Sequence, residues 1–360
     1  MKKLLSRLSA GEMLSAEEFT EIIRSADESF RQELYTAAAN VRKLHYGTDV
    51  YVRGLIEFTN YCKNNCLYCG IRAANRNVER YRLTEEQILA CCEDGYQTGF
   101  RTFVLQGGED PFFTPEKIAR IVSAIKERYP DCAVTLSVGD HTKETYRLWK
   151  EAGADRYLLR HETADALHYG RLHPKNLTLE HRIRCLYHLK ELDYQVGCGF
   201  MVGSPFQTFE HLAKDLLFLW EFQPHMVGIG PFIPHKDTPF RGEAAGTLEL
   251  TLTMVALTRL LLPGVLLPAT TALGSIHPTG RELGVLAGAN VCMPNLSPED
   301  VRDKYTLYNN KLHTGAESAR ALAELSARME TIGYRVVTHR GDHITKQTRK
   351  EAKSCTIPNP

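Results

Sequence analysis

The chain has 360 residues, of which 43% are hydrophobic and 24% charged, and its formal net charge is only +1. A chain of that length can bury a full hydrophobic core without disulfides or bound metals to stabilise it. The balanced charge gives no reason to expect nucleic acid or an anionic membrane as a partner. The first residues lack the apolar stretch of a signal peptide, and Arg259, Pro263 and Gly264 interrupt the most apolar run, so no membrane span is predicted. We therefore expect a cytoplasmic protein, in which ten cysteines indicate metal binding or catalysis.

Residues 1–50 predict helices, in SAEEFTEIIRSA and FRQELYTAAANVRKLHYG. From there on, short apolar runs that end in glycine or polar residues alternate with helical patterns. The runs lie at 52–60, 101–108, 133–139, 156–162, 195–203, 226–234, 266–274 and 289–296. Two helix starts are well marked, by the capping signature at Thr84 and by Pro115 at a first helical position.

Eight strands that alternate with helices predict parallel pairing through crossovers, and near-continuous apolar strands predict a sheet covered on both faces. We therefore expect an α/β fold, a complete (β/α)8 TIM barrel over residues 51–296. The N-terminal helical segment, 1–50, would pack on this barrel. Residues 297–360 would form a C-terminal cap with a loose polar tail. An open doubly wound sheet is the alternative.

Cys62, Cys66 and Cys69 follow the first predicted strand with the spacing C-x3-C-x2-C. Thiolates select zinc or iron–sulfur clusters. A closed zinc site needs a fourth ligand, yet no histidine occurs between His45 and His141. Three cysteines on a 4Fe-4S cube would leave one iron open for a ligand. Zinc and a cluster with a purely redox role remain alternatives at this point.

This cysteine motif after a first barrel strand resembles the radical S-adenosylmethionine (SAM) enzymes. In that superfamily the open iron binds SAM, and an electron from the cluster gives a 5′-deoxyadenosyl radical. The stretches EFTNYCKNNCLYCGIR, FVLQGGEDP, EAGADRYLLRHETA, MVGSPFQT, MVGIGPFIPHKDTP, LPATTALG and GANVCMPNLSP resemble the FeFe-hydrogenase maturases of this superfamily, over roughly residues 50 to 310. Biotin synthase and methylornithine synthase share the plan and match less well.

The resemblance implies a role for each candidate residue. The cysteines would bind the cluster. SAM would be held by Tyr68, Gln106, Gly107, Gly108, Ser137, Glu162, Arg182, Met201 and Ile229, with Tyr68, Met201 and Ile229 beside the adenine and Glu162 on the ribose. Substrate would contact Arg160, Thr270, Thr271 and Tyr308, with Tyr305 nearby. By strand alternation, His161 points away from Arg160 and Glu162 and has a structural role.

The implied cofactors are one 4Fe-4S cluster and SAM, and the implied substrate is a cysteine-bound iron that carries carbon monoxide and cyanide. Expected partners are this small polar substrate, an electron donor such as ferredoxin or flavodoxin, and other hydrogenase maturases. A second cluster is not expected, because the cap has His313, Ala321 and Glu324 where some relatives have cysteines. His339 and His343 in the tail are not expected to bind metal. The rivals are a radical SAM reaction on a free amino acid or biotin-like precursor, and a protein that only carries metal.

Overall fold

A computed structural model describes residues 1–312 and 318–346. Its centre is a parallel sheet whose strand order, β2-β3-β4-β5-β6-β7, is also the order along the chain. The strands are β2 (Gly54–Thr59), β3 (Thr102–Gly107), β4 (Ala133–Ser137), β5 (Arg156–Leu158), β6 (Gln195–Val202) and β7 (Met226–Pro231). This order lacks the reversal that defines a doubly wound sheet, and it confirms the first six predicted strands.

Beyond β7 the sheet continues through single bridges. They join Met226 to Leu266, Pro268 to Val291, and Leu55 to Asn295, all in parallel, so that the pairing returns to β2. The run 266–274 does not form the predicted strand and enters helix α11 (Thr271–Ile276), while 289–296 contains only the short β8 (Val291–Cys292). Pro268 and Pro294 lack the N–H groups that a longer ladder would need.

The predicted strand 52–60 is divided at Arg53. Before it, β1 (Asp49–Val52) pairs with β8 and with β9 (Arg335–Val337), and after it β2 pairs with β3. A three-stranded sheet, β8-β1-β9, therefore joins distant parts of the chain. Packing is tight at the crossing, where a Cβ on Gly54 would lie 2.2 Å from Cδ1 of Leu296.

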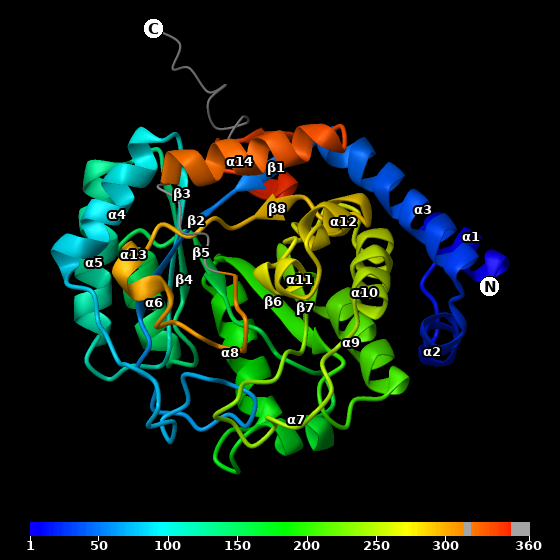
Figure 1. Cartoon of the computed structure of the whole chain (residues 1–360), viewed down its shortest axis with the longest axis horizontal. Helices are drawn as coiled ribbons and strands as arrows, with labels where there is room; N and C mark the ends of the chain where they lie inside the picture. The colour runs from blue at the N-terminus through cyan, green and yellow to red at the C-terminus, as the bar shows by residue number, and fades with distance from the viewer. Residues whose placement is uncertain (313–317, 347–360) are drawn as a thin grey trace, which may run out of the picture.

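Helices cover the outer face of the sheet (Figure 1). Those between the strands are α4 (Glu85–Gln97), α5 (Pro115–Arg128), α6 (Lys143–Glu151), α7 (Ala166–Leu172), α8 (Leu179–Glu191), α9 (Phe209–Phe222) and α10 (Leu248–Leu261). The later helices are α12 (Gly280–Leu286), α13 (Glu299–Arg302) and α14 (Ser318–Thr331). Thr84 forms the capping box of α4 and Pro115 opens α5, which confirms both predicted helix starts. No helix in the described part of the chain is long and apolar enough to cross a membrane.

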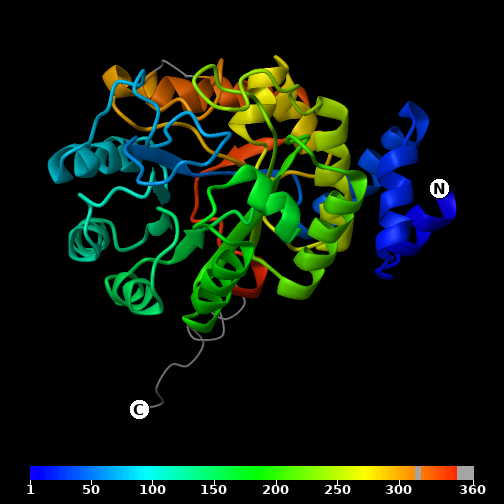
Figure 2. The ribbon, with the colours of Figure 1, turned by 90° about the horizontal axis from the view of Figure 1, so that it is seen from below.

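Three helices precede the sheet, namely α1 (Lys2–Ser9), α2 (Ala16–Ser25) and α3 (Glu28–Tyr46). They pack on the outer helices, with α2 against α9 and α3 against α10 (Figure 2). Ser15 caps α2 in a reciprocal pair of bonds with Glu18, and Phe19, Ile22 and Leu34 are buried in the main core. These residues attach the helices through apolar burial rather than through the sheet.

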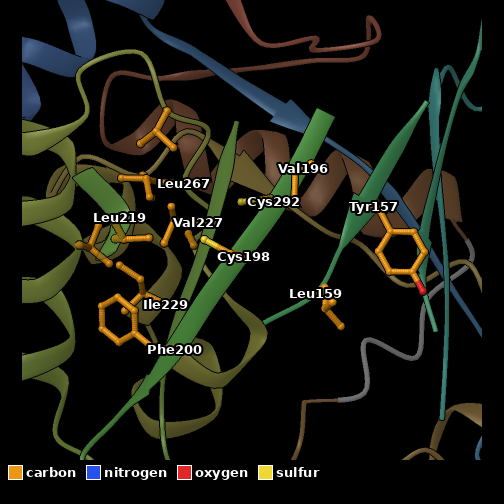
Figure 3. Close-up of a cluster of buried hydrophobic side chains, with 14 of the residues drawn as sticks. Tyr157, Leu159, Val196, Cys198, Phe200, Leu219, Val227, Ile229, Leu267 and Cys292 are labelled. Atoms are coloured by element: carbon orange, nitrogen blue, oxygen red, sulfur yellow. The ribbon is translucent and has the colours of Figure 1, made fainter. Parts of the chain in front are cut away.

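The main apolar core lies between the sheet and the helices that cover it. Figure 3 shows Cys198 and Phe200 of β6 beside Val227 and Ile229 of β7, with Leu219 of α9 in the same cluster. Alternate residues of each strand therefore face outward, and the residues between them face the inside of the sheet. Cys198 faces outward and is fully buried.

The segment after β9 packs against the amino ends of the strands. Asp342 accepts hydrogen bonds at 2.7 Å from Arg156, the first residue of β5, and from Gln195, the first residue of β6. Arg340 pairs with Asp342 at 3.0 Å and with Asp155 at 2.8 Å. The prediction of a loose polar tail is therefore wrong for residues 338–346, because their charges pair with charges at the strand starts. The last fourteen residues of the tail lie outside the described part of the chain.

Candidate active site

A cavity of about 350 Å³ lies at the carboxyl ends of the parallel strands, which is where barrel enzymes carry their chemistry. Among the predicted site residues, those that line it are Tyr68, Cys69, Gln106, Gly107, Ser137, Arg160, Glu162, Arg182, Met201, Thr270, Thr271 and Tyr308. Tyr305 lines it too. Residues that are far apart in the sequence thus meet around a single cavity.

The three cysteines lie in an irregular loop that follows β2. Arg80 holds the backbone of the loop in place, because its guanidinium donates to the carbonyl oxygens of Ile71 at 2.8 Å and Arg72 at 2.7 Å. It is also joined to the cap, because the Gly70 N–H donates to the Leu307 carbonyl at 2.8 Å. A Cβ on Gly70 would lie 2.1 Å from the Thr306 carbonyl oxygen, so only glycine allows this contact.

Cys62, Cys66 and Cys69 are free thiols and partly exposed. Burial raises the pKa of Cys62 and Cys66, and raises that of Cys69 to about 12. Thiolates here therefore need the positive charge of a bound metal. No three His, Cys, Asp or Glu side chains of the described residues are placed to hold a single metal ion. The donor set does not fit a closed zinc site, and it fits a larger group bound through three thiolates.

Two glycines bring β3 close to the cysteine loop. A Cβ on Gly108 would lie 2.2 Å from the Tyr61 carbonyl oxygen and 2.6 Å from Cβ of Cys62. Gly107 and Gln106 line the cavity, whereas Gly108 is packed under the cysteine loop and does not. The backbone at this strand end can therefore approach a ligand that sits between the loop and the cavity.

Charged side chains lie where β5 and α8 meet the cavity. The guanidinium of Arg160 lies 3.0 Å from the Glu162 carboxylate. Arg182 donates to the Arg160 carbonyl at 3.1 Å and lies 3.1 Å from the Asp140 carboxylate. Within the described residues, Nε of Arg160 is buried without a hydrogen-bond partner. Nε of Arg182 and one oxygen of Glu162 have only the ion pairs just named, without a well-aligned hydrogen bond. Such atoms are costly to leave unsatisfied, which is consistent with a polar ligand in this place.

His161 fixes the backbone that carries Glu162. Glu162 has a φ of 67°, which is uncommon for a residue other than glycine. The Gly199 N–H donates to Nδ1 of His161 at 3.3 Å, so the ring proton is on Nε2, which lies 3.2 Å from the Asp215 carboxylate. Burial lowers the pKa of His161 to about 3 and keeps the ring neutral. The side chain faces away from the cavity, as predicted, and its role is structural.

Tyr68 and Met201 belong to one small apolar cluster beside the cysteine loop, together with Leu172, Phe232 and Phe240. The Tyr68 hydroxyl lies 3.1 Å from Nε2 of His173. Nδ1 of His173 lies 2.9 Å from the Tyr169 carbonyl and donates to it, so Nε2 accepts from the tyrosine. Burial lowers the pKa of His173 to about 3, in agreement with a neutral ring. The phenol is thereby fixed at the cavity wall.

Ile229 is placed differently from the prediction. Its side chain packs in the outer core (Figure 3), and its neighbours Gly228 and Gly230 line the cavity. Strand alternation explains the error, because the positions of β7 that face inward are glycines and offer no apolar side chain to recognise.

Three of the predicted substrate residues, Thr270, Thr271 and Tyr308, lie at the start of α11 and in the cap. Thr270 precedes α11 but makes no side-chain cap, and its Oγ1 is buried without a partner among the described residues. Thr271 Oγ1 lies 3.5 Å from a guanidinium nitrogen of Arg281. Burial raises the pKa of Tyr308 to about 12, so its hydroxyl stays protonated and can donate.

Three cavity residues were missed by the sequence analysis. Glu57 of β2 and Lys311 of the cap line the cavity and form a buried ion pair, and Asp140 pairs with Arg182 beside it. A carboxylate in the middle of the apolar run GLIEFT was the available signal for Glu57. Nothing in the local pattern around Lys311 or Asp140 marks either residue.

The chain is similar to known proteins in sequence and in structure. The model of the Radical SAM superfamily matches residues 56–219. Over 306 residues the chain is 50% identical to the [FeFe] hydrogenase maturase subunit HydE of Thermotoga maritima, covering 84% of this chain and 87% of that protein. Over a further 306-residue alignment it is 29% identical to the 3-methylornithine synthase of Methanosarcina barkeri, covering 84% and 85%. The crystal structure of methylornithine synthase (PylB) is similar with a TM-score of 0.82 at 25% identity, over 97% of this chain and 99% of that one.

Proposed function

Because the chain belongs to the radical SAM enzymes, in the family of the [FeFe] hydrogenase maturase subunit HydE, we propose that it acts on a cysteine-bound iron that carries carbon monoxide and cyanide. The reaction would serve assembly of the diiron site of the hydrogenase. Radical SAM enzymes use a 4Fe-4S cluster and SAM, which together supply a 5′-deoxyadenosyl radical. The residues of this chain would bind SAM and the substrate on either side of that radical.

The residues on the cysteine-loop side of the cavity would hold SAM. Cys62, Cys66 and Cys69 would bind three irons through thiolates, and the backbone carbonyl at Gly107 would accept from the SAM ammonium. Gly108 packs under the cysteine loop and would let the strand end approach it closely. Glu162 would accept from the ribose hydroxyls, with Ser137 and Arg182 near the SAM carboxylate and Tyr68 and Met201 against the adenine. Gln106, which lines the cavity, would also contact SAM. Only the backbone beside Ile229 would take part, since its side chain faces the core.

The observation that carries the substrate proposal is the set of unsatisfied buried atoms on one cavity wall. Nε of Arg160 and the hydroxyl of Thr270 have no hydrogen-bond partner among the described residues, and a second Arg160 nitrogen has only its ion pair with Glu162. Arg160 can bind a carboxylate with two parallel bonds. The hydroxyls of Thr270, Thr271 and Tyr308 can donate to polar groups deeper in the cavity. Together they suit a small polar or anionic ligand with a carboxylate at one end.

The fold proposal is that the bridges beyond β7 close a complete (β/α)8 barrel. The parallel bridges through residues 266–268 and 291–295 support this closure. The barrel would span residues 51–296, between the helical segment 1–50 and the cap and tail 297–360. We also propose that the protein works in the cytoplasm, with a ferredoxin or flavodoxin as electron donor and with the other hydrogenase maturases as partners.

The second candidate is a radical SAM reaction on a free amino acid, of the methylornithine synthase type. The 29% identity to 3-methylornithine synthase over most of both chains favours it over the remaining rivals. A biotin synthase-like sulfur insertion is disfavoured, because Cys198 faces the outer core and not the cavity. A protein that only carries metal would need no such cavity.

One experiment separates these candidates. The reconstituted protein is reduced in the presence of SAM, first with the cysteine-bound iron carbonyl cyanide and the other maturases, and then with free amino acids. Active hydrogenase in the first mixture supports the proposal. Failure of maturation together with turnover of a free amino acid would favour the second candidate instead.

A further inference from the structure

Lys311 and Glu57 form an ion pair that is buried in the wall of the active-site cavity. The side chains are 6% and 1% exposed, and the Lys311 ammonium donates to Oε1 of Glu57. The other oxygen of Glu57 accepts from the Asn295 side chain at 2.9 Å. The pair thus joins the cap, β2 and the segment after β8.

The Lys311 ammonium has one N–H left that can donate to a ligand. A lysine ammonium has three N–H donors. One goes to Glu57 and one to the Tyr305 carbonyl at 2.8 Å, and the ring of Tyr305 lies 4.7 Å from Nζ. No third acceptor stands among the described residues, and Lys311 lines the cavity. The third N–H is therefore available to an acceptor inside the cavity.

Holding the cap in place does not by itself explain this pair. Burying two charges costs desolvation that their attraction only partly offsets, so apolar side chains of similar volume would hold two segments at least as well. The pair also lies in the cavity wall and not in the apolar core, which is where ionisable groups are commonly functional. Glu57 accepts from two partners, so it fixes the ammonium in one position.

Lys311 and Arg160 reach the cavity beside different strands. The strand that carries Glu57 is separated from β5, which leads to Arg160, by β3 and β4. Both cations line the same cavity of about 350 Å³. We infer that Lys311 is a second substrate cation, whose third N–H binds an acceptor group at the end of the substrate opposite to the one held by Arg160.

This inference rests on the proposed function and narrows it. The substrate would carry hydrogen-bond acceptors at two ends, one a carboxylate for Arg160 and one a small anionic or strongly dipolar group for Lys311. Glu57 would be a positioning residue that holds the ammonium and does not itself bind substrate.

Two variants test the inference, with the cysteine-bound iron carbonyl cyanide supplied at increasing concentration to the full maturation mixture. Lys311→Met keeps the length of the side chain and removes its charge and donors. Glu57→Gln keeps one acceptor for Lys311, and it loses the carboxylate charge and the acceptor for the Asn295 amide. We expect Lys311→Met to raise the half-saturating concentration about ten- to hundredfold, with SAM binding close to wild type. Its melting temperature should fall, because Glu57 stays buried without its partner, and the double variant Lys311→Met/Glu57→Gln should recover the melting temperature but not the dose dependence of wild type. Glu57→Gln should also raise the half-saturating concentration, but several-fold less than Lys311→Met does.

The outcomes are distinct. If both single variants lose maturation equally, together with SAM binding, or if the double variant recovers the dose dependence of wild type, the pair only docks the cap and the inference fails. It fails as well if Lys311→Met shows the dose dependence of wild type. If wild type itself supports no maturation, the proposed function fails and takes this inference with it, whereas an active wild type beside an unaffected Lys311→Met overturns the inference alone.

Discussion

Replacing Arg160 by lysine should separate substrate binding from SAM binding. Lysine keeps the positive charge near Glu162, from which the Arg160 guanidinium is 3.0 Å away, but it loses the planar fork that can hold a carboxylate through two bonds. The backbone at this position should not move, because Arg182 holds the Arg160 carbonyl and not its side chain.

The expected magnitude follows from the contact that is lost. One charge-assisted hydrogen bond contributes about 1.5–3 kcal/mol, which corresponds to roughly ten- to hundredfold in affinity. Arg160→Lys should therefore need about ten- to hundredfold more substrate for half-maximal maturation, while its affinity for SAM stays near that of wild type. Arg184→Lys is the matched control, because Arg184 is exposed on α8 and pairs only with Glu180 on the same helix among its described contacts.

Equilibrium SAM binding and in vitro maturation with the other maturases are measured on the same preparations. A parallel loss of SAM affinity and maturation would make Arg160 a SAM-binding or folding residue and refute the reasoning. A fully active Arg160→Lys protein would remove Arg160 from the substrate site.

Three further predictions concern the cluster and stability. Cys62→Ala, Cys66→Ala or Cys69→Ala should each abolish formation of 5′-deoxyadenosine, because each removes an iron ligand, whereas Cys91→Ala, Cys132→Ala and Cys198→Ala should retain it; activity in Cys66→Ala would contradict the assignment. Anaerobic reconstitution should give about four irons per chain, the content of one cube, and about eight irons with two cluster signals would show a second cluster. Here Ala321 and Glu324 lie on α14, and His313 lies outside the described residues. Burial lowers the pKa of His161 and His173 to about 3 and that of His168 to about 4, so the unfolded chain binds protons below about pH 6.5 that the folded chain does not. Stability should thus be complete above that pH and fall as pH decreases toward about 4, by about 2 kcal/mol per histidine at about pH 5; a urea midpoint that is the same at about pH 7 and pH 5 would contradict this.

The sequence predicted the parts of the fold in which local pattern and tertiary structure agree. The runs that became β2 to β7 are apolar and end at glycine or polar residues, and those ends line the cavity. The later strands were overestimated, because the prolines at 268 and 294 limit pairing to bridges.

The sequence did not reveal which residues pair with partners far away along the chain. Arg340 and Asp342 looked solvated in a polar tail, yet they pair with Asp155 and Arg156, which lie far away in the sequence. Lys311 likewise pairs with Glu57, which lies more than two hundred residues earlier in the sequence. The error at Ile229 has a local cause, since inward-facing glycines leave no side chain for a pattern to use.

The most direct test of the account is whether the reduced, reconstituted protein converts SAM to 5′-deoxyadenosine. The account predicts that the wild-type protein forms 5′-deoxyadenosine and methionine in equal amounts, and that Cys66→Ala, prepared in the same way, forms neither. SAM that remains intact with a fully reconstituted and reduced cluster, or equal cleavage by Cys66→Ala, would contradict it.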